Sequence, residues 1–77
     1  MIKYSLKTKE EITKFIRIAR LYPGLIIDMS FGKYTVDGKS FLGVQSLMGH
    51  EVIVNAIGKD ETVEMFYEDL RKVISNG

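Results

Sequence analysis

The sequence predicts an α+β fold: a two-layer α/β sandwich whose four-stranded antiparallel sheet is covered on one face by helices. The chain has 77 residues, which is enough for one domain spanning residues 1–77. Short runs rich in β-branched residues alternate with stretches whose apolar residues recur at helical spacing. The resulting order is β-α-β-β-α-β-α, and such short strands mixed with helices favour an antiparallel sheet.

The first strand and first helix have clear signals. Residues 2–6, IKYSL, alternate between apolar and polar residues, as a strand at the surface of a core does. Thr8 followed by Glu11 forms a capping box just before an apolar run. The helix then ends at Pro23-Gly24. Its apolar stripe lies at i, i+3, i+4 and i+7, which are Ile12, Phe15, Ile16 and Ala19.

The middle of the chain predicts a hairpin and a short helix. Residues 25–30 read as a strand, Phe31-Gly32 as a turn, and residues 33–37 as the partner strand. Asp37-Gly38 is a second turn signal. The stretch SFLGVQSLM then predicts a short helix with Ser40 as its N-cap.

The last third predicts one strand and one helix. Gly49-His50 ends the short helix, residues 51–57 form the most strand-like run, and Asp60 is the expected N-cap of the final helix. One face of that helix carries Val63, Phe66, Leu70, Val73 and Ile74. The expected core between sheet and helices includes Phe15, Ile16, Ile53, Phe66 and Leu70.

Composition excludes several classes of protein. There is no cysteine, so disulfide frameworks, zinc ribbons and iron–sulfur sites are excluded, and we expect no metal and no cofactor. The N-terminus is too polar for a signal peptide and no apolar run is long enough to cross a bilayer, so we expect a cytoplasmic protein without membrane contact. Residues 1–39 carry eight basic and four acidic residues and residues 40–77 three and six. That asymmetry is too mild to argue for nucleic acid.

The nine residues Lys39–Leu47, KSFLGVQSL, together with the element order, resemble HPr, the histidine-containing phosphocarrier protein of the bacterial sugar phosphotransferase system. The resemblance covers nearly the whole chain, and the Gly-x-Asp-Glu before the last helix adds to it. The spacing departs between the second and third strands and between Leu47 and Glu51. The resemblance implies the HPr-like sandwich and a role in that system.

The active-site histidine of that family has no counterpart here. The family carries phosphate on a histidine in a Gly-x-His-Ala-Arg-Pro run at the start of the first helix, where free N–H groups and the helix dipole stabilise the phosphoryl group. The histidine position falls on Thr8, the arginine on Glu10 and the proline on Glu11. Two carboxylates would oppose a phosphoryl group, so the carrier function is expected to be lost.

Two further features are implied by the resemblance. The serine corresponding to Ser40 is a regulatory phosphorylation site in Gram-positive members, with Lys39 beside it, although an N-cap alone would also explain a serine there. The family's docking patch lies on the short helix, flanked by basic residues of the first helix. The corresponding partner-binding candidates, which could equally form a solvated face, are Arg17, Arg20, Phe41, Leu42, Gln45 and Leu47.

These features predict a regulatory or protein-docking module, not an enzyme, because no catalytic constellation is present. Two alternatives stay open: a phosphocarrier acting through the single histidine, His50, or a degenerate structural domain. The expected partners are proteins, such as phosphotransferase-system enzymes, a serine kinase or a transcriptional regulator. The chain could be a monomer or a homodimer.

Overall fold

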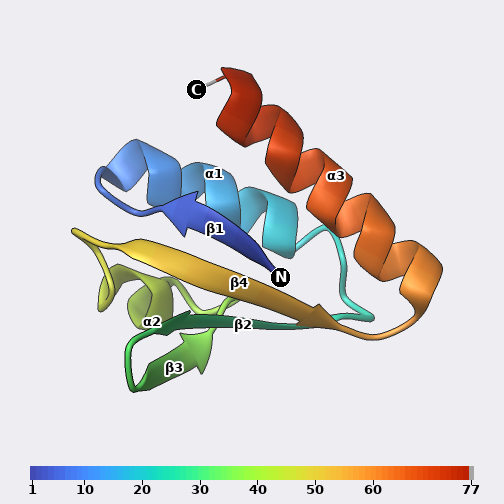
Figure 1. The fold of residues 1–77 in the computed structure, drawn as a ribbon, viewed down its shortest axis with the longest axis horizontal. Coiled ribbons are helices and arrows are strands. Elements are labelled where there is room, and N and C mark those ends of the chain that lie inside the picture. The colour runs from blue at the N-terminus through green and yellow to red at the C-terminus, as the bar shows by residue number, and fades with distance from the viewer. Residues whose placement is uncertain (77) are drawn as a thin grey trace.

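A computed structural model describes residues 1–76, and within them it has four strands and three helices. The predicted element order is confirmed (Figure 1). The elements are β1 (Ile2–Ser5), α1 (Lys9–Ala19), β2 (Ile26–Phe31), β3 (Tyr34–Asp37), α2 (Phe41–Gln45), β4 (Glu51–Ile57) and α3 (Asp60–Asn76).

The four strands form one antiparallel sheet with the order β1-β4-β2-β3. The central strand β4 pairs with β1 on one side and β2 on the other, so that Val54 lies opposite both Ile2 and Met29. In Figure 1, α1 and α3 lie on the same side of the sheet. α1 also contacts α2, and the three helices together cover one face.

The covered face of the sheet forms one side of the core. Val52, Val54, Ile27 and Met29 are each almost completely buried. Because side chains alternate across a strand, the residues between them point to the opposite, open face.

Ile53 lies on this open face and is 41% exposed, so its predicted place in the core was wrong. It has the same orientation as Ile57, which pairs directly with Ile26 of β2. These two isoleucines are also exposed. The strand EVIVNAI therefore carries apolar residues on both faces although only one face is covered by helices.

The helices complete the core with the predicted stripes. All four stripe residues of α1 are buried, and Ile18 joins them. In α3, Phe66 and Leu70 are fully buried and Val63 and Val73 are partly buried. Two details of α3 were predicted wrongly: Ile74 is 44% exposed, and Asp60 is the first helical residue rather than the residue before the helix.

Phe66 is the centre of an aromatic cluster that joins α3 to α1 and to the segment after α1. Its ring meets Tyr22 edge-on with centroids 5.6 Å apart, and Phe15 edge-on at 6.4 Å. Phe15 in turn packs on Tyr4 of β1 at 5.3 Å. Edge-to-face pairs of this kind add stabilisation beyond the area they bury.

The hairpin between β2 and β3 turns at Gly32-Lys33, one residue later than the sequence predicted, because β2 continues to Phe31. Gly32 has φ 58°, a left-handed conformation that glycine adopts without strain. The tight turn brings Phe31 opposite Tyr34.

α3 also closes one end of the sheet. β1 begins at Ile2, which pairs with Val54, whereas β4 continues beyond Val54 to Ile57. The Ala56 N–H, beyond the end of β1, donates a hydrogen bond of 2.8 Å to the hydroxyl oxygen of Tyr67 in α3. A helix side chain therefore satisfies a strand donor for which the sheet has no partner.

We predict that Phe66→Ala lowers the free energy of unfolding by about 3–5 kcal/mol, because it leaves a cavity at the centre of the aromatic cluster. Ile53→Ala is the matched control. It removes an apolar side chain from the open face and should cost about 1 kcal/mol or less. Urea titration of both variants measures the difference, and equal losses would contradict this description of the core.

Candidate functional site

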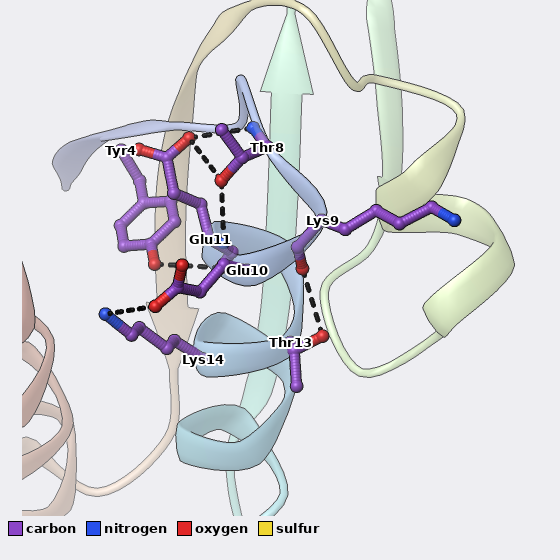
Figure 2. Close-up of polar contacts among 7 residues, drawn as sticks. All are labelled: Tyr4, Thr8, Lys9, Glu10, Glu11, Thr13 and Lys14. Carbon is purple, nitrogen blue, oxygen red and sulfur yellow. Dashed lines mark hydrogen bonds and ion pairs between the residues drawn. The ribbon is translucent and has the colours of Figure 1, made fainter.

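The N-terminus of α1 is closed by the predicted capping box (Figure 2). The Glu11 N–H donates to the Thr8 hydroxyl oxygen at 3.2 Å. The Glu11 carboxylate accepts from the N–H groups of Lys7 at 2.7 Å and Thr8 at 2.9 Å. The backbone donors before the helix are thus already bonded to a carboxylate of the chain itself.

The second carboxylate at this position, Glu10, is exposed and pairs with Lys14 at 3.4 Å, one turn further along α1. Figure 2 shows this pair on the surface of the helix, beside the Tyr4 hydroxyl that donates to the Glu11 carbonyl oxygen at 2.9 Å. An exposed i,i+4 pair contributes only about 0.3–0.5 kcal/mol. Of the three residues at the phosphoryl position of the resembled family, Thr8 and Glu11 therefore bind each other, whereas Glu10 binds Lys14.

Ser40 is the N-cap of α2, as predicted. Its hydroxyl oxygen accepts a hydrogen bond from the Gly43 N–H at 3.2 Å. The turn before it depends on Gly38, whose N–H donates to the Ile27 carbonyl oxygen at 2.7 Å. A Cβ atom at position 38 would lie 2.6 Å from the Ile27 side chain, so only glycine fits this approach.

Lys39 connects the start of α2 to the loop that follows α1. Its ammonium group donates to the backbone carbonyl oxygens of Tyr22 at 2.7 Å and Leu25 at 2.5 Å. Its own N–H donates to the Asp37 carboxylate at 2.9 Å. The lysine before the serine therefore fastens two loops together, a role that the local sequence did not indicate.

The two basic candidates of α1 lie in different surroundings. The Arg20 guanidinium lies 3.5 Å from the Lys39 carbonyl oxygen, at the N-terminal end of α2. Arg17 instead lines a groove between α1 and α3, together with Lys72. The structure thus brings Arg20, but not Arg17, to the start of α2.

The predicted partner-binding residues in α2 and just after it differ in their solvent exposure. Leu42 is 78% exposed, Phe41 is 43% exposed and Gln45 is exposed. Leu47 is 5% exposed and belongs to the core with Val44, so its predicted contact with a partner was wrong. The reason is its place just after the last turn, where the chain folds back toward β4.

His50 is exposed at the start of β4, and its ring stacks on Phe31 with centroids 3.9 Å apart and an angle of 15° between the planes. Sequence reasoning missed this contact because it depends on the pairing of distant strands. Among the residues that the structure describes, no three histidine or carboxylate side chains gather in a group suited to a metal ion. The ring of His50 therefore has an aromatic neighbour in Phe31.

Tyr22 links the site to the core. Its carbonyl oxygen accepts from Lys39, and its hydroxyl donates to the Asp69 carboxylate of α3. Burial, the hydrogen bond to Asp69 and the charge of Asp69 raise the pKa of Tyr22 to about 12. Burial and then the charge of Glu11 raise the pKa of Tyr4 to about 12 as well.

No protein-family model, curated protein or solved structure matches the chain. The resemblance to HPr therefore depends on the motif Lys39–Leu47 and the element order alone. Within residues 1–76, each helix is too short or too polar to cross a bilayer.

We predict that alkaline pH destabilises the protein through these two tyrosines. Each tyrosine has a pKa of about 10 in the unfolded chain and about 12 in the folded protein. The folded state therefore holds the phenolic proton more tightly than the unfolded state does. The stabilisation is complete below about pH 10 and is lost progressively as the pH rises to about 12.

Urea unfolding of Tyr22→Phe between about pH 9 and 12 should therefore show a shallower fall in stability than the unsubstituted protein shows. Tyr34→Phe is the control, because Tyr34 is 69% exposed. A slope that responds equally to both substitutions would contradict the role of Tyr22.

Proposed function

We propose that this chain is a cytoplasmic regulatory module related to HPr, which binds a protein partner through α2 and does not carry phosphate on a histidine. The docking surface consists of Arg20, Phe41, Leu42 and Gln45. The observation that carries the proposal is the exposure of two large apolar side chains, Leu42 at 78% and Phe41 at 43%, on a helix that is firmly held.

Several contacts fix α2 in place. Val44 and Leu47 are buried, the Ser40 hydroxyl caps the first turn, and Lys39 fastens the preceding loop. A helix of five residues would not be stable without such contacts. Leu42 is therefore exposed on a rigid element, which is how an anchor residue of a protein interface is presented.

The charge near α2 indicates the chemistry of the partner. Arg20 lies at the start of the helix, and α2 itself carries neither acidic nor basic residues. An apolar centre with a basic neighbour fits a partner that has an apolar pocket and an acidic rim. A phosphotransferase-system enzyme, a serine kinase or a transcriptional regulator could provide such a surface.

Ser40 is the proposed switch of this surface. Phosphorylation would place about −1.5 to −2 charges at the start of α2. Lys39 is bonded to two carbonyl oxygens, so Arg20 is the nearby cation that remains for the phosphate. The modification would therefore change the sign of the charge beside Leu42 and with it the preferred partner.

The N-terminus of α1 supports the loss of the carrier role. A phosphoryl group at position 8 would lie next to the Glu11 carboxylate, which already accepts hydrogen bonds from the N–H groups of Lys7 and Thr8. It would also meet that carboxylate at close range, and like charges repel.

We predict that Leu42→Asp and Arg20→Glu each abolish recovery of the partner in pull-downs from the source organism, while Ser40→Asp changes the amount recovered. Met65→Asp is the matched control: Met65 is 57% exposed on α3, away from the docking surface, and its replacement should leave recovery unchanged. The same partners in the same amounts from all four variants would contradict a docking surface on α2.

We also predict that incubation with the phosphoenolpyruvate-dependent enzyme of the phosphotransferase system yields no acid-labile phosphate on this chain. Labelled phosphoenolpyruvate and an acid-stability assay measure this, with an ordinary HPr as the positive control. Acid-labile phosphate that disappears in His50→Ala would instead establish the alternative, a carrier acting through His50.

A further inference from the structure

A basic groove lies between α1 and α3, on the side of α1 away from α2. It has a volume of about 320 Å³ and is lined by Lys14, Arg17, Ile18, Lys72 and Val73. α1 and α3 pack against each other, so the groove is formed by two elements of the rigid core. Among these residues, the resemblance to HPr implies a role only for Arg17, as a contact to a protein partner.

The walls of the groove are basic without a compensating acid in the lining. Two cations come from α1 and one from α3. Lys14 pairs with Glu10 at 3.4 Å, and this is the one ion pair that the described residues form. Arg17 and Lys72 thus line the groove without a carboxylate partner, and an anion bound there would reduce the repulsion between these two charges.

The floor of the groove is apolar. Ile18 is 8% exposed and Val73 is partly buried. An apolar floor excludes water from one side of the charges, which strengthens their attraction for an anion. It also provides a surface on which an apolar part of a ligand can lie.

We propose that this groove binds a phosphate monoester with a compact apolar body. Arg17 and Lys72, which have no carboxylate partner, suit a phosphate dianion better than a singly charged carboxylate ligand, and the guanidinium of Arg17 matches the geometry of phosphate oxygens. The volume lies at the lower end of the roughly 300–1,000 Å³ of small-molecule sites, so the ligand is small.

This site does not depend on the proposed function. Lys72 and Val73 belong to α3 and have no part in the docking surface on α2. Loss of protein docking would leave the groove intact, and failure of ligand binding would leave the docking surface intact.

The test is a titration of the protein with phenyl phosphate near neutral pH, followed by amide chemical shifts and by calorimetry. Inorganic phosphate tests the anion alone, and phenol tests the apolar body alone. Phenyl phosphate should bind saturably and more tightly than either, with the largest shifts at residues 14–18 and 70–74. Leu42→Asp should bind phenyl phosphate as the unsubstituted protein does.

The decisive comparison uses two variants that remove the same charge. Arg17→Gln/Lys72→Gln should raise the Kd for phenyl phosphate at least about tenfold. Lys33→Gln/Lys59→Gln removes two exposed cations outside the groove and should change the Kd less than about twofold. Thermal melts of both variants check that the fold is retained.

Three results would overturn the proposal. Phenyl phosphate that fails to saturate the protein at millimolar concentrations would show that the groove holds no such ligand. Equal weakening in the two double variants would show only a general attraction of anions to a basic chain. Equal affinity for phenol and phenyl phosphate would show that the basic residues take no part.

Discussion

The packing of Phe66 against Phe15 and Tyr22 is the interaction on which the rest of the molecule depends. A chain of this length buries a smaller share of its surface on folding than a larger domain does, and helices cover only one face of its sheet. The aromatic cluster is where α1, α3 and the segment after α1 meet over that sheet. Without it, α3 would have little to hold it on α1, and the groove between the two helices would not exist.

A short series of contacts connects the same aromatic cluster to α2. The ring of Tyr22 packs on Phe66, its hydroxyl binds Asp69, and its carbonyl oxygen holds the ammonium of Lys39. Lys39 precedes Ser40, which caps α2. A helix too short to be stable alone is thereby joined to Phe66, a fully buried residue of the core. Lys39 and Ser40 are thus adjacent because the lysine attaches the start of α2 to the loop after α1 and the serine caps the helix.

Local sequence signals predicted the features that depend on neighbours in the chain. The capping box of Thr8 and Glu11, the cap at Ser40 and the bounds of β4 all follow from short-range hydrogen bonding and side-chain periodicity. The sequence did not predict features that depend on contacts between residues far apart in the chain. Ile53 has the same apolar character as its buried neighbours, and only the placement of the helices decides which face is covered. The contacts of Lys39 with Tyr22 and Leu25, the stack of His50 on Phe31 and the burial of Leu47 likewise arise from tertiary structure.

The hydrogen bond from Ala56 to Tyr67 has a consequence for self-association. Without this hydrogen bond, the part of β4 beyond its pairing with β1 would present free backbone groups beside exposed Ile57. An uncovered apolar strand end is a template for pairing with another chain. α3 therefore covers this end of β4 in addition to packing on the core. A chain cut short before α3 would leave the end of β4 free to pair with a strand of a second copy, so α3 also limits self-association through this strand.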